Sequence, residues 1–481
     1  MAEIEKRIQK VDEKLNVGTS FDVVKKELLI GGKRKACMYY INPFGNSEII
    51  SRVLAFLLAA GQQAECIQED PVGFLQAGIP YAEFTTVAKE EKALYFVLSG
   101  AALLLVDGIT DYCILDARRY LQRSVDEPQK DKVLRGSHDG FVEALLPNIG
   151  LIRRRIRDSN LIFEKITVGT RSCSDIAVCY IKDLAEKNEV DSIRERIRSL
   201  QVEALPMGQE SLAEVLIDKR WYNPFPKVRY TERPDSAAAM LLEGSVIILC
   251  DNNPAAMILP TSIFDFLQDT DDFSFPPMVG GYLKIVRSGV YVLSLIATPL
   301  WYLLLKNPDY LPQLFYFFGE KGESTVPILL QLLLVEFGID GLKLASLNTP
   351  EALNSSLGII GGLILGEMAI KVGWLSSQVI FYMAFAAIAN FTQPSYELGY
   401  AFKFMRILTL ILIALFNGWG LLLGAIVTFW LIATNASVGQ RSYLYPLYPF
   451  NRVAMRRLIL RSRLKNGQKQ PVSRRFNKSD H

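Results

Sequence analysis

The chain has 481 residues, enough for two or three domains, and its formal net charge of +3 is small. Its two histidines, His138 and His481, exclude a histidine-based metal site and argue against a Ser-His-Asp triad. The chain also lacks a Gly-x-x-x-x-Gly-Lys-Ser/Thr loop and a Gly-x-Gly-x-x-Gly turn after a strand, so we predict no enzyme activity, no cofactor, no metal and no nucleic-acid partner.

The beginning of the chain is charged. Residues Met1 to Arg7 carry no apolar segment of the signal-peptide type, so we expect the first membrane span to act as the insertion signal. The six cysteines all precede the apolar half, none forms a Cys-x-x-Cys pair, and most lie in apolar runs. This pattern predicts reduced core cysteines in a cytosolic region.

The first half of the chain contains two similar units, offset by about 140 residues. In each unit an apolar strand is followed by an amphipathic helix, and later by a Gly-containing apolar strand that ends at an aspartate. The matching segments are 36–41 with 177–181, 47–60 with 188–200, and 98–107 with 242–251. Uninterrupted apolar strands indicate sheets that are covered on both faces by helices. We therefore predict two similar α/β cytosolic subdomains, at 1–125 and 126–280.

Some charged groups in these units have two interpretations. Asp107 and Asp251 are interpreted as turn residues that follow their strands, rather than as ligands. The run Arg153 to Arg155, on a helix expected over 140–157, indicates either a solvated helix face or a docking surface for partners or lipid head groups. The acidic residues of 269–272 are interpreted as a polar linker, because a calcium loop would need a glycine at its turn.

The second half is strongly apolar over 281–438, which predicts a polytopic α-helical transmembrane bundle followed by a basic cytosolic tail at 439–481. The first span is expected at Ser288 to Leu305, because a bilayer core needs about 20 apolar residues with some tolerance. Further apolar segments lie at 326–347, 357–375, 379–391 and 404–434, and the last of these is interrupted at Asn417-Gly418. The glycine-rich run 358–366 predicts close helix packing.

Polar residues within these segments are the candidate pore or gating residues. They are Glu336, Glu367, Lys371, Asn390, Gln393 and Glu397. Charged groups in apolar helices are costly and usually face the bundle interior or water. Glu367 and Lys371 are interpreted either as an i,i+4 pair tucked between helices or as a polar face on a water-filled path. The last three residues surround Pro394 at a break between spans, where freed backbone is tolerated only inside protein or beside a cavity.

The charge distribution predicts the topology. A heavily basic tail stays in the cytosol, and a leaderless N-terminal region should stay there too. Both ends inside require an even number of crossings, and the apolar segments support four to six. Tail arginines are expected to contact anionic lipid in the bilayer.

Several long motifs carry a resemblance to a known family. These are 224–235 with 241–244 and Asp251, 136–143 with 148–155, 167–172 with 178–181, Gly358 to Gly362, and Pro446 to Phe450. They resemble the A subunits of the spore-germination GerA family, over nearly the whole chain. Gly18 to Asp22, Gly31 to Lys33, and Asn390 to Arg406 are more similar to the branch of the stage V sporulation protein AF than to nutrient-receptor A subunits.

The resemblance implies a multi-pass protein of the spore inner membrane, with a helical membrane region and a large cytosolic N-terminal region that assemble as a homo-oligomer. It also implies partners among other germination membrane proteins: B- and C-type subunits or a small membrane partner. The family is thought to form ion channels that release monovalent cations when germination of bacterial endospores begins.

Three functions are weighed on this basis. The first is a channel subunit in which Glu336 or Glu367 forms a cation-attracting ring, a common device in cation channels. The second is a non-conducting scaffold or signalling subunit that recruits partners through its cytosolic region. The third, a membrane enzyme, has little support because no nucleophile, base or metal constellation is visible in the sequence.

Overall fold

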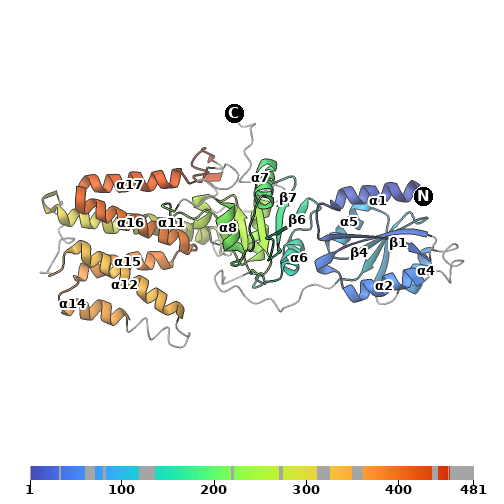
Figure 1. Cartoon of the computed structure of the whole chain (residues 1–481), viewed down its shortest axis with the longest axis horizontal. Helices are drawn as coiled ribbons and strands as arrows, with labels where there is room; N and C mark the ends of the chain where they lie inside the picture. The colour runs from blue at the N-terminus through green and yellow to red at the C-terminus, as the bar shows by residue number, and fades with distance from the viewer. Residues whose placement is uncertain are drawn as a thin grey trace.

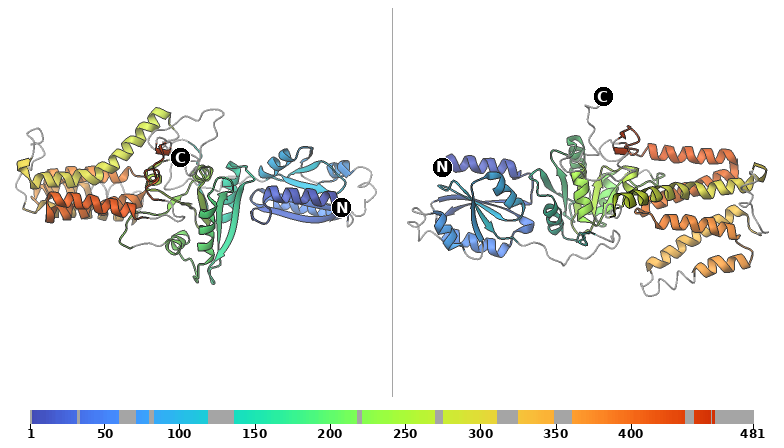
Figure 2. Two further views of the ribbon diagram at one scale, coloured as in Figure 1. Left: turned by 90° about the horizontal axis from the view of Figure 1, so that it is seen from above. Right: turned by 180° about the vertical axis from the view of Figure 1, so that it is seen from behind.

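A computed structural model describes residues 2–31, 34–59, 71–79, 83–118, 136–217, 221–269, 275–310, 325–348, 361–435, 442–452 and 454–455. The molecule is elongated: a first sheet subdomain lies at one end, a second sheet subdomain in the middle and a group of helices at the other end (Figure 1). Figure 2 shows the same order from above and from behind.

The first subdomain is a five-stranded antiparallel sheet of order β1-β2-β4-β5-β3. Its strands are β1 (Val23–Ile30), β2 (Arg34–Ile41), β3 (Glu83–Val87), β4 (Ala102–Val106) and β5 (Tyr112–Asp116). Helices α1 (Ala2–Leu15) and α5 (Glu90–Leu98) pack on one face, while α2 (Ser47–Ala59) and α4 (Pro71–Gly78) pack on the other. All five residues of β4 are buried, as expected for a strand covered on both faces.

The second subdomain repeats this arrangement, with the order β6-β7-β9-β10-β8. Its strands are β6 (Leu161–Val168), β7 (Ser174–Ile181), β8 (Arg229–Thr231), β9 (Val246–Cys250) and β10 (Ala256–Leu259). Helices α6 (Leu145–Arg155) and α9 (Pro234–Leu242) cover one face, while α7 (Lys187–Arg198) and α8 (Gln209–Leu216) cover the other. The predicted duplication is confirmed, because β2 matches β7 and β4 matches β9 in both position and pairing.

Two local predictions in the second subdomain have different outcomes. The helix expected from Gly140 begins only at Leu145, where the side chain of Asp251 accepts a hydrogen bond from the Leu145 amide at 3.1 Å. Asp251 follows β9 directly and precedes Asn252, whose φ is 61°. The turn interpretation of Asp251 is therefore confirmed, and its carboxylate also anchors the start of α6.

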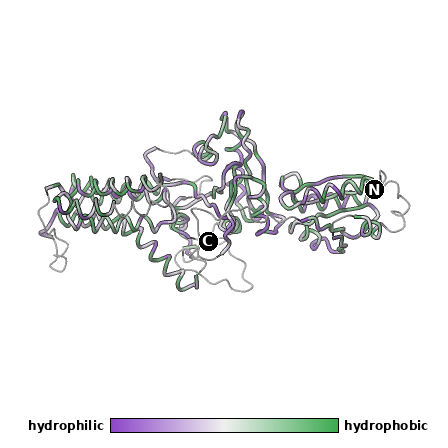
Figure 3. Tube along the Cα trace, turned by 90° about the horizontal axis from the view of Figure 1, so that it is seen from below, coloured by the Kyte–Doolittle hydropathy of each residue, from purple (hydrophilic) through white to green (hydrophobic). Residues whose placement is uncertain are grey.

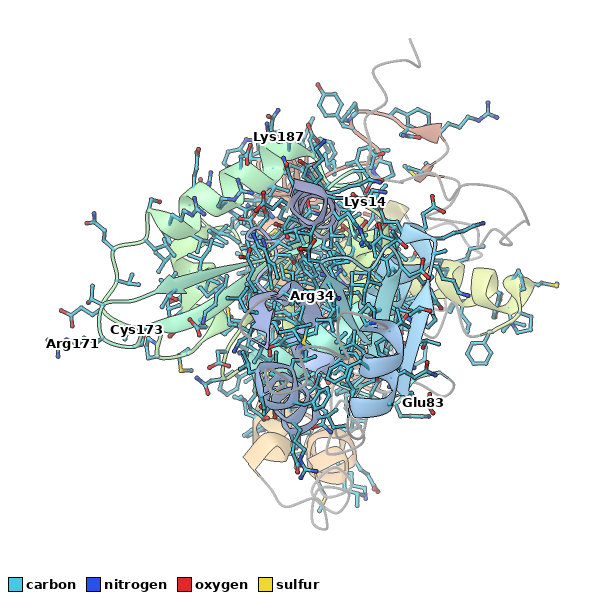
Figure 4. The ribbon with its side chains drawn as sticks, turned by 90° about the vertical axis from the view of Figure 1, so that its right-hand side faces the viewer. Lys14, Arg34, Glu83, Arg171, Cys173 and Lys187 are labelled. Carbon is cyan, nitrogen blue, oxygen red and sulfur yellow. The ribbon has the colours of Figure 1, made fainter. Side chains whose placement is uncertain are left out.

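Four of the cysteines, Cys37, Cys113, Cys179 and Cys250, are free and buried, as predicted. Cys173 is exposed, and that part of the prediction is wrong. It lies in the turn between β6 and β7 with a φ of 43°, at the outer edge of the molecule beside Arg171 (Figure 4). Cys66 lies outside the described residues.

The helical region is rich in apolar residues (Figure 3). It contains α11 (Pro277–Lys306), α12 (Ile328–Asn348), the π-helical η6 (Leu363–Met368), α14 (Ala369–Lys371), α15 (Ser377–Phe391), α16 (Tyr396–Phe416) and α17 (Gly418–Ala433), with a short 3-10 turn, η4 (Pro308–Tyr310), after α11. Two other short 3-10 turns belong to the sheet subdomains: η1 (Asn42–Phe44) follows β2 and η3 (Ile263–Leu267) follows β10. Among the described residues, α11 and α16 are long and apolar enough to cross a membrane, and α15 and α17 are shorter apolar helices. At 1.5 Å per residue α16 is about 31 Å long, close to the thickness of a bilayer core.

The ends of these helices confirm two predicted breaks. The turn between α16 and α17 lies at Asn417, whose φ is 54° and whose amide exchanges hydrogen bonds of 2.6 and 2.7 Å with that of Asn307 after α11. The break between α15 and α16 contains Pro394, and Ser395 caps α16 by accepting from the Leu398 amide at 3.3 Å. The two turns lie at opposite ends of α16.

The close helix packing predicted for the glycine-rich run 358–366 is confirmed at one of its described glycines and not at two others. A Cβ on Gly361 would lie 2.2 Å from the side chain of Leu342, so this glycine does face α12. Gly362 and Gly366 have open space instead, and residues 358–360 lie outside the described residues. The tightest approach is at Gly420 of α17, where a Cβ would lie 2.1 Å from a backbone oxygen of α16. A small residue there lets the two helices meet.

Candidate functional site

A buried ion network joins α12 and α16 within the helical region. Glu336 is 6% exposed and Arg406 is 1% exposed, and the Glu336 Oε1 atom lies 2.5 Å from Nη2 of Arg406. The Lys403 ammonium lies 3.6 Å from the same carboxylate and also forms an ion pair with Asp340. Buried charges need partners of this kind, because unpaired ions are expensive to remove from water.

The helical period explains why these side chains meet. Residues 336, 340 and 343 lie three to four positions apart, so they share one face of α12, and residues 396, 400, 403 and 406 share one face of α16. Lys343 lies 4.5 Å from the ring centre of Tyr396 and 4.6 Å from that of Tyr400. Its charge is therefore held by aromatic faces, which attract cations.

Arg406 also connects the network to a third helix. Its Nη1 atom donates to the carbonyl oxygen of Ser294 in α11 at 3.0 Å. Ser294 lies in the membrane-length part of α11, and Arg406 lies near the middle of α16, so the network sits deep within the bundle. One arginine thus fixes three helices against one another.

The charges of this network do not sum to a negative site. Two carboxylates, Glu336 and Asp340, face three cations, Lys343, Lys403 and Arg406, which leaves an excess of one positive charge. Glu336 is present in the structure as the partner of Arg406 rather than as a free carboxylate.

Glu367 and Lys371 lie elsewhere, on η6 and α14. The predicted i,i+4 pair forms, with 2.6 Å between Lys371 Nζ and Glu367 Oε1. The side chains are 56% and 64% exposed within the described chain, so the pair is not tucked between helices as one interpretation expected. Both side chains therefore lie on the outer surface of the single chain.

The α15–α16 turn brings together two of the predicted residues. Gln393 is 7% exposed, and neither its Oε1 nor its Nε2 atom has a hydrogen-bond partner among the described residues; the same holds for Oδ1 of Asn390. Both amides lie beside Gly399, where a Cβ would be 2.6 Å from Gln393 Oε1 and 3.8 Å from Asn390 Oδ1. Glu397, in the first turn of α16, has an exposed side chain.

The second subdomain is attached to the helices at this same end. Phe225 packs edge-on against Phe402 of α16, with ring centres 5.8 Å apart, and Phe402 packs in the same way on Tyr291 of α11 at 5.5 Å. The Asn223 amide donates to the carbonyl of Leu431 in α17 at 3.1 Å. One loop of the sheet subdomain therefore contacts two apolar helices, α16 and α17, and Phe402 connects this contact to α11.

A second buried ion pair connects the two sheet subdomains. Asp22, just before β1, lies 2.9 Å from Arg153 on α6, and both side chains are at most 1% exposed. Arg153 also donates to the carbonyls of Asp158 and Leu161, each at 2.9 Å. Neither interpretation of the arginine run is correct at Arg153, because the side chain is neither solvated nor available for docking. Arg155 pairs with Asp139 at 2.5 Å, and only Arg154 is exposed.

Burial disfavours the ionised Asp139 carboxyl, but the Arg155 guanidinium outweighs this effect and holds the pKa of Asp139 below its usual value.

Four residues that the structure shows to be important were not predicted from the sequence: Asp22, Lys403, Arg406 and Gly420. Lys403 and Arg406 had a usable signal, since two cations three positions apart in an apolar helix require buried partners.

The comparisons with known proteins identify the family. The family model described as "Bacillus/Clostridium GerA spore germination protein" matches residues 9–473. This chain belongs to the GerA family of spore germination proteins. It is 38% identical over 452 residues to stage V sporulation protein AF of Bacillus subtilis (strain 168), covering 93% of this chain and 90% of that protein. The predicted family and its branch are confirmed.

Receptor-type relatives of this GerA-family chain are less similar. Spore germination protein B1 of the same organism is 28% identical over 440 residues, covering 90% of each chain. Spore germination protein KA is 27% identical over 470 residues, covering 96% of this chain and 85% of that protein. The crystal structure of the N-terminal domain of the A subunit of the Bacillus megaterium spore germinant receptor GerK3 aligns at 25% identity with a TM-score of 0.38, covering 52% of this chain and 92% of that one.

Proposed function

We propose that this GerA-family protein is a membrane subunit of a spore-germination complex that assembles as a homo-oligomeric ion channel and releases monovalent cations during germination. The buried network of Glu336, Arg406, Lys403 and Asp340 carries the proposal. Charged groups deep within an apolar helix bundle are costly and are concentrated on ion pathways and switches.

In this proposal the ion pairs of Glu336, Asp340, Lys403 and Arg406 hold the channel closed, and we name them the latch. While Arg406 and Lys403 neutralise Glu336, no free carboxylate is available to attract a cation. Lys403 contacts both Glu336 and Asp340, so a small rotation of α16 against α12 exchanges one partner for the other. Opening releases the Glu336 carboxylate toward a shared hydrated centre of the oligomer. Gln393 and Asn390, whose amide oxygens have no hydrogen-bond partner in the described part of the chain, provide the polar lining at the cytosolic turn.

The placement in the cell follows from the same proposal. The helical region spans the spore inner membrane with both termini in the cytosol, and other germination membrane proteins, such as B- and C-type subunits or a small membrane partner, assemble with it. The order of helix ends supports an even number of crossings, because Asn307 and Asn417 meet at one end while Asn223 meets Leu431 at the other.

A non-conducting scaffold is the second candidate, and one observation favours it. Four charges of the network, Glu336, Asp340, Lys403 and Arg406, pair with one another, and Lys343 lies against two aromatic rings. A network whose members all have partners also serves to hold helices together. In this case the paired sheet subdomains recruit partners and the helices anchor them.

Potassium efflux from proteoliposomes separates the two functions. A channel releases potassium from liposomes that hold the purified oligomer, whereas an intact oligomer in a tight bilayer favours the scaffold. Glu336→Gln should alter the efflux rate or the selectivity between potassium and sodium, and Glu336→Asp, which keeps the charge, should retain more of the wild-type behaviour. Glu367→Gln is the matched control on the exposed pair, and equal effects of Glu336→Gln and Glu367→Gln would contradict the latch.

A further inference from the structure

An exposed aromatic pair lies on the loop between α8 and β8. The side chain of Trp221 is 95% exposed and that of Tyr222 is 43% exposed, with ring centres 6.1 Å apart and planes at 87°. Such a large apolar surface in water is unfavourable, and exposed aromatic surface of this kind marks contact with another phase or molecule.

The position of this pair relative to the helices is fixed by its neighbours. Asn223, two residues after Trp221, donates to the carbonyl of Leu431, and α17 ends at Ala433. Two peptide units place the Trp221 Cα within about 8 Å of the Asn223 Cα. Trp221 therefore lies within about 8 Å of a residue that contacts the last turn of α17, at the end of the bundle that faces the sheet subdomains.

A second segment exposes aromatic side chains near the same end. The Tyr443 carbonyl accepts from the Ile263 amide at 2.9 Å, and Tyr443 is buried in the same apolar cluster as Leu431. The turn that follows exposes Tyr448 at 71% and Phe450 at 68%. These two segments, separated by more than two hundred residues, carry aromatic groups around the cytosolic end of the helices.

We propose that these two segments, which we name the aromatic rim (Trp221, Tyr222, Tyr448 and Phe450), insert into the lipid headgroup layer on the cytosolic side of the membrane. Two observations favour lipid as the occupant. The rim is continuous with the ends of apolar helices, where Trp and Tyr are enriched at membrane interfaces. It is also followed directly by basic residues, which attract anionic lipid: Arg452, Arg456, Arg457, Arg461 and Arg463.

As a consequence, the second sheet subdomain is held in one position relative to the membrane. The loop between α8 and β8 packs on α16 through Phe225 and enters the headgroup layer through Trp221. The subdomain is then held at one height and tilt above the bilayer, rather than moving on its attachment. This inference rests on the membrane placement in the proposed function, but not on conduction.

Depth-dependent quenching of tryptophan fluorescence tests the rim. The full-length protein is reconstituted in vesicles of phosphatidylcholine and phosphatidylglycerol, with bromine atoms placed on the acyl chains close to the headgroup. Subtracting the emission of Trp221→Phe from that of the wild type isolates the Trp221 contribution. We expect brominated lipid to quench this contribution strongly, and aqueous iodide to quench it weakly.

Two references make the result decisive. Subtraction with Trp419→Phe reports Trp419, which is 74% exposed on the first turn of α17 at the far end of the bundle, so its quenching reports insertion of the helices. Tyr95→Trp, in the Trp221→Phe background, places a tryptophan at a 52% exposed position of the first subdomain and should respond to iodide alone.

Each other outcome overturns the proposal. If Trp419 is quenched by brominated lipid while Trp221 is open to iodide, the rim lies in water. If Trp221 is shielded from both quenchers, a protein surface such as a second copy covers it. If Trp419 itself is not quenched, the membrane placement of the helices fails and the rim fails with it.

Discussion

Removing the charge of Glu336 should destabilise the helical region far more than removing that of Glu367. The side chains of Glu336 and Arg406 are 8% and 2% exposed, whereas the side chains of Glu367 and Lys371 are 56% and 64% exposed. Glu336→Gln keeps the shape of the side chain but leaves Asp340 alone to balance the cations of the network. Breaking a buried pair by changing one partner costs about 3–5 kcal/mol. Breaking an exposed i,i+4 pair costs about 0.3–0.5 kcal/mol.

Thermal unfolding in detergent micelles measures this difference. For a region of this size, about 1 kcal/mol shifts the unfolding midpoint by roughly 2–4 °C. Glu336→Gln should therefore lower the midpoint by roughly 6–20 °C, and Glu367→Gln by roughly 1–2 °C. The midpoint is followed by tryptophan emission, and size-exclusion chromatography checks that each variant starts from the same assembly.

A double variant identifies the cause of the loss. Glu336→Leu together with Arg406→Met removes both charges and should recover much of the stability lost in Glu336→Gln, because well-packed apolar residues often replace a buried pair without loss. Equal midpoints for Glu336→Gln and Glu367→Gln would refute the reasoning. So would a double variant whose loss equals the sum of its single losses.

Three further predictions concern other parts of the chain. Asp22→Asn should lower the free energy of unfolding by about 3–5 kcal/mol in denaturant titrations, because Arg153 remains buried without its counter-charge; an unchanged midpoint would contradict this. Gly420→Ala should separate α17 from α16 and lower the thermal midpoint, whereas Gly418→Ala, which has open space, should not; similar midpoints would remove the packing argument. Burial raises the pKa of the Cys250 thiol to about 12, so this thiol should resist maleimide at pH 8.5 until the protein is denatured. The contribution of Cys250 to the free energy of unfolding should be full below about pH 9 and should fall as the pH rises toward 12. Rapid native labelling, read by mass spectrometry, would contradict that burial.

Features that depend on local order along the chain could be predicted from the sequence. The duplication was visible because strands buried on both faces, such as β4 and β9, form uninterrupted apolar runs. The break at Asn417 was visible because an Asn-Gly step interrupts a segment too long for one span. Long motifs also indicated the family, which the match over residues 9–473 confirms.

Only the tertiary structure decided which charged groups face one another. Glu336 and Arg406 are 70 residues apart in the chain, and Asp22 and Arg153 are 131 apart. Helical periodicity shows that Glu336, Asp340 and Lys343 share a face, but the partner of that face depends on the rotation of α12 against α16. Packing also decides that Glu367 on η6 is exposed while Glu336 on α12 is buried, although both are single carboxylates in apolar segments. Composition sets the cost of burying a charge, and packing sets which cation offsets that cost.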